Sequence, residues 1–289
     1  MRKPIIACSR AADMEQRVTA YVEALKDAAF GIGDHGFASE RAFWESGLFD
    51  SAIEKLRGRK AAARSAKQGF IELVLEHMRE RGLVSRFKFA GDGERHDWEV
   101  DMPDGRKCVI EAKGCLDGNN TNIFERPANA DEFLIWSLCQ NKGADPRHNA
   151  WSGLHTRLSA EVVHKRQVVD GVIIWDMLCG NARECPKLAV DETRATTLAS
   201  GKSVPPPCIY LFPRSIPDPR NNPNPRPWEL SEQRFLAALS KAFHGDANDV
   251  VKVEIAVQMG GVHVERKCKF VANGKTLAET NWTPIARAR

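Results

Sequence analysis

The 289-residue sequence has no CxxC pair, no long apolar run and only two tyrosines. A zinc ribbon needs two thiolates on one turn, and none of the eight cysteines is paired in that way. No apolar stretch approaches the roughly 18 residues of a membrane-spanning helix, and the segment from Pro4 to Cys8 is too short for the core of a signal peptide. We therefore expect a cytoplasmic protein without a membrane partner.

The sequence also lacks a strong charge of either sign. Lys and Arg together number 42 against 38 Asp and Glu, a formal charge of +4, which permits a nucleic-acid partner without arguing for one. Hydrophobic residues make up 43%, enough to form a core, so the composition excludes a disordered chain. No GxxxxGK[ST] motif occurs, which excludes a P-loop ATPase or helicase.

Composition and periodicity divide the chain into three regions. Residues 1–60 predict short helices, residues 61–180 predict an α/β core, and residues 181–289 predict an extension packed on that core. The extension begins with a proline-rich stretch, since nine of the fifteen prolines lie between Pro205 and Pro227. That stretch predicts an extended surface loop, followed by a helix capped by Ser231 and by a hairpin around the sequence MGG.

The central region carries the clearest sequence of elements. An amphipathic helix is predicted to end at Gly82, and the apolar period then changes from 3.6 to 2, which predicts three strands up to residue 113. Helices are predicted at residues 129–141 and 151–166. An apolar run at residues 168–176 predicts a buried strand.

The segment DWEVDMPDGRKCVIEAKG, residues 97–114, predicts a hairpin with a definite register. Its turn, PDG, suits a three-residue loop with a glycine bulge, which pairs Met102 with Arg106. Counting outward places Asp97 opposite Glu111, with Lys113 on the same face. Two carboxylates beside a main-chain carbonyl form the oxygen-only site that Mg²⁺ prefers, and a nearby lysine can hold a water or a phosphate oxygen. These groups suit phosphodiester hydrolysis.

At these residues the sequence resembles the PD-(D/E)XK nuclease superfamily, with Asp97 followed by the triplet Glu111-Ala112-Lys113. The likeness covers roughly residues 61–176, and the predicted order of elements matches the αβββαβ core of the family, a mixed four-stranded sheet flanked by helices. The resemblance implies that Asp97, Glu111 and the carbonyl of Ala112 bind Mg²⁺ and that Lys113 is the catalytic lysine. One departure is that His-Asp replaces the Pro-Asp of the family name.

Two assignments within this motif have rivals. Many family members add a glutamate from the first core helix, and Glu72 is preferred here over Glu76, one turn further along. Asp101 is a rival for Asp97, but the predicted register places it opposite Lys107, about 13 Å along the strand.

Several polar segments are candidates for DNA contact. The basic run at residues 57–67 could neutralise phosphates, the GNNTN segment lies just past the catalytic strand, and the stretch at residues 145–157 concentrates side chains suited to base edges. Each has an ordinary alternative, namely a solvated helix face, a turn and a capped helix start. The candidate DNA-binding residues are Arg59, Lys60, Arg64, Asn120, Arg147, Asn149 and Arg157.

Other metal and nuclease signatures are weaker. Cys179 and Cys185 are the nearest approach to a metal-binding pair, but the five residues between them are unusual for zinc. His148 and Asn149 lack the adjacent histidine pair and metal-finger spacing of an HNH site, and a HEPN ribonuclease would need more than the loosely spaced Arg157 and His164.

The function indicated is Mg²⁺-dependent endonucleolytic cleavage of double-stranded DNA. The segment EAKGCLDGNNTNIFERP looks most like a type II restriction endonuclease, which implies site-specific double-strand cleavage in defence. Cutting both strands needs two active sites, so a homodimer is expected, together with a separately encoded DNA methyltransferase. The alternatives are a repair or recombination nuclease that reads DNA structure, and a DNA-binding module in which the acidic hairpin is incidental.

Overall fold

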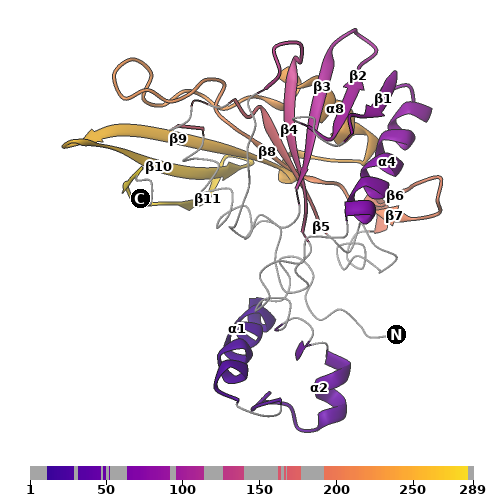
Figure 1. The fold of residues 1–289 in the computed structure, drawn as a ribbon, viewed down its shortest axis with the longest axis vertical. Coiled ribbons are helices and arrows are strands. Elements are labelled where there is room, and N and C mark those ends of the chain that lie inside the picture. Colours follow the sequence, from indigo (N-terminus) through magenta and orange to yellow (C-terminus); the bar gives the residue numbers. More distant parts are fainter. Residues whose placement is uncertain are drawn as a thin grey trace.

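The computed structural model describes residues 12–28, 32–46, 48–49, 52, 64–91, 96–113, 126–139, 162–163, 166, 168–176 and 192–285. These residues form a mixed α/β structure built on one large sheet (Figure 1). The α-helices are α1 (Ala12–Asp27), α2 (Glu40–Ser46), α4 (Arg64–Glu80) and α8 (Arg234–Ala242), with 3-10 helices η3 (Glu192–Arg194), η4 (Leu230–Glu232) and η5 (Ala247–Asp249). Among the described helices, none is long and apolar enough to cross a membrane.

The strands join into a ten-stranded sheet and a separate two-stranded ribbon. The large sheet contains β1 (Arg86–Phe89), β2 (Trp98–Asp101), β3 (Lys107–Lys113), β4 (Glu132–Cys139), β5 (Gly171–Asp176), β8 (Cys208–Leu211), β9 (Val250–Gly260), β10 (His263–Ala272), β11 (Lys275–Glu279) and β12 (Thr283–Pro284). The ribbon pairs β6 (Thr196–Thr197) with β7 (Ser203–Val204).

The order of the large sheet explains how the core of the molecule is assembled. It runs β1-β2-β3-β4-β5-β8-β9-β10-β11, with β12 paired to β10. The first three strands form an antiparallel meander, whereas β3, β4 and β5 are parallel to one another. The predicted mixed four-stranded core is therefore part of a larger sheet, because the strands predicted as an extension continue the same hydrogen-bonded ladder.

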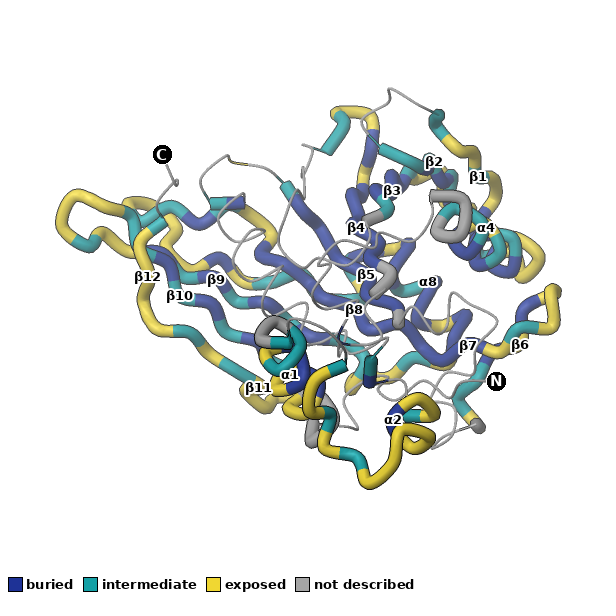
Figure 2. The backbone as a smooth tube through the Cα atoms, turned by 60° about the horizontal axis from the view of Figure 1, so that its bottom comes forward, coloured by how far each residue is buried: buried dark blue, intermediate teal, exposed yellow. Residues whose placement is uncertain are grey.

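Both faces of the central strands are buried, as Figure 2 shows by the dark tube along them. On one face, α4 and α8 pack over alternate residues such as Ile110, Trp136 and Trp175. The intervening residues, such as Val109 and Ile135, belong to a second apolar cluster on the opposite face. This alternation follows from the two-residue period of a strand.

Helix α4 ends where the sequence predicted, for a local reason. Gly82 adopts a left-handed conformation with φ +69°, and its N–H donates to the carbonyl of Arg79 at 2.9 Å. The N–H of Leu83 donates to the carbonyl of Met78 at 2.9 Å, which completes a Schellman cap. This cap turns the chain into β1.

The N-terminal helices form their own small cluster, which lies away from the sheet in Figure 1. Its buried residues include Val18, Tyr21 and Phe43, and Ser39 caps α2 by accepting the N–H of Ala42 at 3.2 Å.

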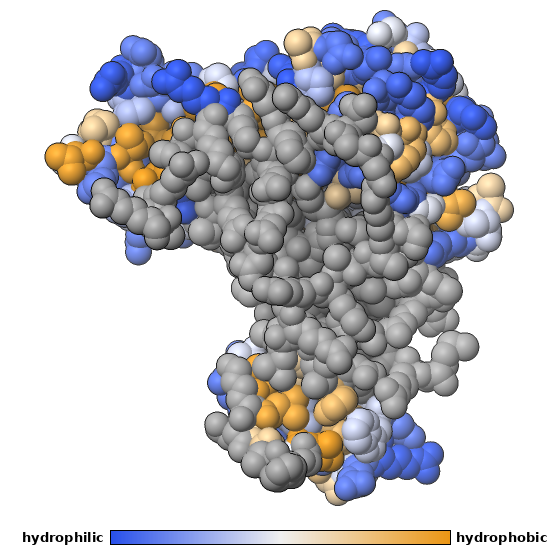
Figure 3. Space-filling view, viewed as in Figure 1, coloured by the Kyte–Doolittle hydropathy of each residue, from blue (hydrophilic) through white to orange (hydrophobic). Residues whose placement is uncertain are grey.

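In the view of Figure 3, apolar side chains also gather at the free end of the β9–β10 hairpin, where Met259 and Val262 are exposed.

The prediction of a helix at residues 129–141 is wrong. Residues 132–139 form β4, which pairs in parallel with β3 on one side and β5 on the other. The segment FLIWSLC is apolar apart from Ser137, so periodicity alone could not separate a buried helix from a strand buried on both faces. The run at residues 168–176 does form a buried strand, β5, as predicted.

Two predictions for the C-terminal region are also corrected. The proline-rich stretch is not a surface loop throughout, because it contains β8, whose four residues are all buried between β5 and β9. Ser231 lies in η4 and does not cap the following helix, since Gln233 is the N-cap of α8 and makes no side-chain capping bond. The final hairpin, β9–β10, pairs Gly260 with His263 as the MGG signal predicted.

Candidate active site

The hairpin of β2 and β3 has the predicted turn. Gly105 adopts φ +84° and donates to the carbonyl of Met102 at 3.0 Å, and the N–H of Met102 donates to the carbonyl of Arg106 at 2.8 Å. The pairing then continues without a slip to Trp98 opposite Ile110. The local chemistry of the turn thus sets the register that carries the candidate carboxylates.

Asp97 lies against the end of β3. Its N–H donates to the carbonyl of Ile110 at 2.9 Å, and its Oδ2 accepts the N–H of Ala112 at 2.7 Å. The N–H of Asp97 thus bonds to Ile110, the residue before its predicted partner Glu111. The regular pairing of β2 with β3 therefore ends at Asp97. Asp97 nevertheless spans the position of Glu111, because its main-chain N–H bonds to Ile110 and its side chain bonds to Ala112.

Glu111 is a nearly buried carboxylate with 8% of its surface exposed. Ile110 and Ala112 pack on the α4 side of the sheet, so the intervening Glu111 projects from the opposite face. Lys113 ends β3 and pairs with Ser137 of β4 in the parallel register. The side chain of Lys113 lies outside the described residues.

A small charge network lies beside this site on the hairpin. Glu99 contacts Lys88 at 3.2 Å, Lys107 at 3.5 Å and the Nε2 of His96 at 3.4 Å. Burial alone would raise the pKa of Glu99, but the hydrogen bond and charge of Lys88, with smaller contributions from His96 and Lys107, lower it overall. Glu99 is therefore held as a carboxylate that balances the charges of Lys88 and Lys107.

The rival acidic residues lie elsewhere. Glu72 is on α4, on the opposite side of the sheet from the Glu111 carboxylate, so the structure does not bring these two side chains together. Glu76 is engaged by Arg79 at 2.5 Å. Asp101 is at the far end of β2, where Arg86 contacts its Oδ2 at 3.1 Å.

The donor chemistry of the site fits a hard divalent cation. Asp97, Glu111 and the carbonyl of Ala112 supply only oxygen atoms, which suit Mg²⁺. Within the part of the chain that is described, no group of three His, Cys, Asp or Glu side chains is positioned to hold a metal. The candidate site has only two such side chains, Asp97 and Glu111, and its third oxygen is the main-chain carbonyl of Ala112.

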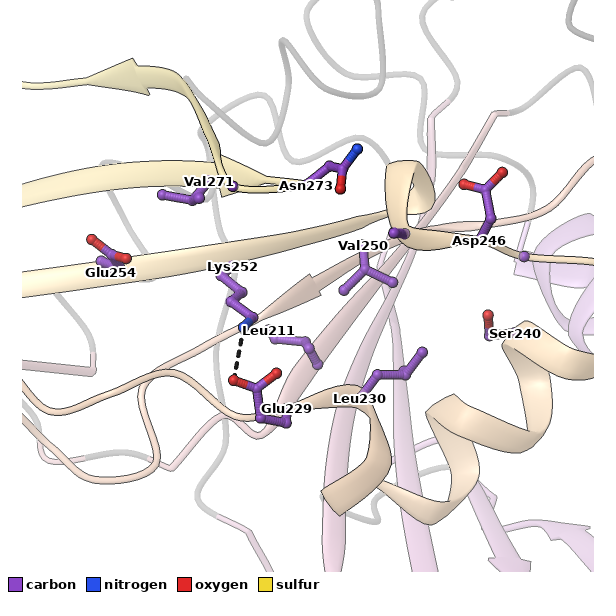
Figure 4. A pocket seen from close by; sticks show the side chains of 13 residues that line it. Leu211, Glu229, Leu230, Ser240, Asp246, Val250, Lys252, Glu254, Val271 and Asn273 are labelled. Atoms are coloured by element: carbon purple, nitrogen blue, oxygen red, sulfur yellow. Dashed lines mark hydrogen bonds and ion pairs between the residues drawn. The ribbon is translucent and has the colours of Figure 1, made fainter.

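Two pockets lined by described residues differ in chemistry. One of about 340 Å³ lies between α4 and β1, beside Trp98. The other, of about 630 Å³, is bounded by the ends of α8 and η5 and by β9 (Figure 4). Its charged side chains are Glu229, Asp246, Lys252 and Glu254, with Lys252 bonded to Glu229 at 2.7 Å. Its excess of carboxylates would repel phosphate, so we assign it no part in DNA binding.

Most of the predicted DNA-binding residues lie outside the described residues. Arg64 begins α4, although its side chain is not described. The others in undescribed segments are Arg59, Lys60, Asn120, Arg147, Asn149 and Arg157, and the same holds for Cys179 and Cys185.

The sequence did not identify the aromatic residues that line the smaller pocket, on the α4 face of the sheet. Phe89 and Trp98 belong to this lining, and Trp98 is at the same time a buried core residue with 3% of its surface exposed. Trp136 and Trp175 are likewise buried in the core. The only available signal was the position of Trp98 next to Asp97, because aromatic residues in a strand predict a core equally well.

Comparisons with known proteins do not assign the chain to a family. No protein-family model matches it, and no curated protein or solved structure shows a significant match. We therefore infer the function from the site itself.

Proposed function

We propose that the protein is a metal-dependent DNA endonuclease of the PD-(D/E)XK type, with its active site at Asp97, Glu111 and Lys113. The observation that carries this proposal is the 2.7 Å hydrogen bond from the N–H of Ala112 to Asp97 Oδ2. It holds one carboxylate beside the triplet Glu111-Ala112-Lys113, on the adjacent strand. The order α4, an antiparallel β1-β2-β3 meander and a parallel β4 is also compatible with a mixed core sheet of the expected kind.

Each residue has a distinct role in this proposal. Asp97 and Glu111 hold Mg²⁺ together with the carbonyl of Ala112, and the bound ion would supply Lewis-acid stabilisation of the charge that develops on the phosphate. The main-chain bond to Asp97 fixes one carboxylate before substrate arrives, which avoids a reorganisation cost during the reaction. Lys113 positions a water or a phosphate oxygen by donating from its ammonium group.

The substrate we propose is double-stranded DNA, cut at specific sites by a homodimer in a defence role. Two active sites related by a twofold axis would cut the two strands of a palindromic site. Digestion of plasmid DNA with Mg²⁺ tests this finer proposal. Discrete fragments support site-specific cleavage, nicking or smearing indicates a repair nuclease, and retention without cutting indicates a DNA-binding module.

The site assignment is tested with Asp97→Asn. The amide oxygen of asparagine can still accept the N–H of Ala112, so the fold is expected to persist while one metal-binding charge is lost. We expect the rate of plasmid cleavage in Mg²⁺ to fall at least about a hundredfold, with DNA binding retained.

Asp101→Asn is the matched control, because Asp101 is an aspartate on the same hairpin with a surface ion pair to Arg86. Its cleavage rate should stay within about twofold of the wild type. Near-normal cleavage by folded Asp97→Asn protein, or equal losses in the two variants, would refute the site.

A further inference from the structure

The larger cavity, of about 630 Å³, lies on the α8 face of the sheet. Leu211, Lys252 and Val271 occupy neighbouring positions on β8, β9 and β10, so their side chains share one face. Leu211 packs in the same apolar cluster as α4 and α8, whereas Glu111 projects from the opposite face. The sheet therefore separates this cavity from the proposed active site, and an inference about it does not rest on the proposed function.

The floor of the cavity is apolar and aliphatic. Its volume is in the range of cavities that bind small molecules. An aliphatic chain laid on this floor gains free energy in proportion to the apolar surface removed from water. The described lining includes no aromatic ring, so the floor suits a flexible chain better than a stacked planar ring. The floor residues are Leu211, Leu230, Val250 and Val271.

The charged groups around the floor are mostly acceptors. The lining has three carboxylates, Glu229, Asp246 and Glu254, and one ammonium group, that of Lys252. A carboxylate has about four acceptor sites, so contact with one cation leaves it able to accept from a ligand. The existing contacts are Lys252 with Glu229 at 2.7 Å, Arg194 with Asp246 at 3.4 Å and Lys269 with Glu254 at 3.6 Å.

Ser240 provides an independent indication of a ligand. It lies in the last turn of α8, is only 5% exposed and lines the cavity. Its hydroxyl forms no hydrogen bond with the described residues. In Figure 4 this oxygen is directed from α8 toward Asp246, which also lines the cavity. Buried polar groups are normally hydrogen-bonded, so this hydroxyl is suited to bond a polar group of a ligand.

The polar groups lie at two ends of an elongated site. Figure 4 shows Ser240 and Asp246 at one end and Glu254 at the other, with Val250 between them. Along β9 alone, the distance from Val250 to Glu254 is about 13 Å at roughly 3.3 Å per residue. A matching ligand is a chain of about this length that carries polar groups at both ends.

We propose that this cavity binds a linear aliphatic polyamine. Its ammonium groups lie at the carboxylates, and its methylene groups cover the apolar floor. An ammonium group only donates hydrogen bonds, so it matches carboxylate and hydroxyl acceptors, whereas the same carboxylates disfavour an anion. The three carboxylates match a triamine, with its internal nitrogen at Glu229. Lys252 stays bonded to Glu229, which balances its charge within the lining.

The test is isothermal titration calorimetry without DNA, because DNA itself attracts polyamines. The probe is spermidine, a triamine, and the comparison ligand is octanediol, a chain of similar length without charge. We expect spermidine to bind at one site per chain and more weakly as the salt concentration rises. Octanediol should show no measurable binding, because it lacks the ammonium groups that the carboxylates accept.

Two variants probe the two ends of the cavity. Glu254→Gln removes one charge and should weaken spermidine binding about tenfold, and Ser240→Ala removes the hydroxyl and should weaken it about fivefold. Glu265→Gln is the matched control. Glu265 is a carboxylate on the same face of the β9–β10 hairpin, is bonded to Gln258 at 2.9 Å and lies outside the cavity lining. This control should bind spermidine within about twofold of the wild type.

Each outcome decides for or against the proposal. Failure of spermidine to bind the wild type overturns it, and so does equal weakening in Glu254→Gln and Glu265→Gln, which would indicate a diffuse attraction of cations to the surface. Octanediol binding as tight as that of spermidine would also overturn it, because the floor alone would then hold the ligand. Unchanged binding by Ser240→Ala would refute a ligand that spans the cavity.

Discussion

Glu132 offers a quantitative test of how the sheet and α8 are joined. Its carboxylate, at the start of β4, is 3% exposed and accepts the N–H of Arg234 at 2.5 Å and of Phe235 at 3.1 Å. It therefore caps the first turn of α8 from a residue about a hundred positions away. Burial raises the pKa of Glu132 to about 7, with a further rise from Asp170, although the two N–H groups act in the opposite direction.

The raised pKa makes stability depend on pH in a defined direction. The ordinary pKa of a glutamate side chain is 4.5, and well below this pH Glu132 is protonated in both the folded and the unfolded chain. Between about pH 4.5 and 7 the unfolded chain ionises first, so the free energy of unfolding decreases as the pH rises. A difference of about 2.5 pKa units corresponds to about 3 kcal/mol lost across this window.

Glu132→Gln is the perturbation to make. The amide cannot ionise, and its oxygen can still accept N–H groups at the start of α8. Urea unfolding of both proteins from pH 4 to 8 should show the variant gaining about 3 kcal/mol relative to the wild type between pH 4.5 and 7. Asp170, whose pKa is also raised by burial, is present in both proteins. The difference between their free energies of unfolding therefore contains less of the pH dependence that Asp170 causes.

Glu279→Gln is the control, because Glu279 is an exposed carboxylate whose pKa is lowered by its hydrogen bond to Lys267. The difference between its free energy of unfolding and that of the wild type should change with pH in the opposite direction, and only below about pH 4.5. Parallel unfolding curves for Glu132→Gln and the wild type over the whole range would refute the reasoning about Glu132.

Two further predictions concern packing and electrostatics. A Cβ at Gly171 would lie 2.4 Å from Leu236 Cδ1 in the closed core, so Gly171→Ala should lower the free energy of unfolding by about 1–3 kcal/mol. Gly69 lies in α4 and has no neighbouring atom where a Cβ would be, so Gly69→Ala should raise the free energy of unfolding by up to about 1 kcal/mol; equal effects of the two substitutions in urea unfolding would contradict this. Neutralising the basic run should weaken binding to all DNA sequences alike and lower the slope of log affinity against log salt by up to about 3, and an unchanged slope would return the run to a solvated helix face. The substitutions are Arg59→Gln, Lys60→Gln and Arg64→Gln.

The smaller pocket depended on an arrangement that no local pattern reveals. Its lining comes from α4, β1 and β2, and its character depends on how far Phe89 is exposed at the edge of the sheet. The same aromatic residues, read from the sequence, fit a core strand equally well. Exposure is a property of the assembled sheet, so only the structure separates Phe89 from buried residues such as Trp136.

Elements that depend on local chemistry were predictable from the order of residues along the chain. Pro103 and Gly105 set the turn and hence the register that brings Asp97 beside Glu111, and Gly82 ends α4. Residues 132–139 form a strand because of their neighbours in the folded protein: β3 and β5 offer hydrogen bonds on both sides to a segment without periodicity. In the same way, contacts between distant parts of the chain put β8, within the proline-rich stretch, into the sheet and let Glu132 cap α8. Turns and caps act between residues a few positions apart, whereas sheet order and buried charge depend on partners that the chain brings together only when it folds.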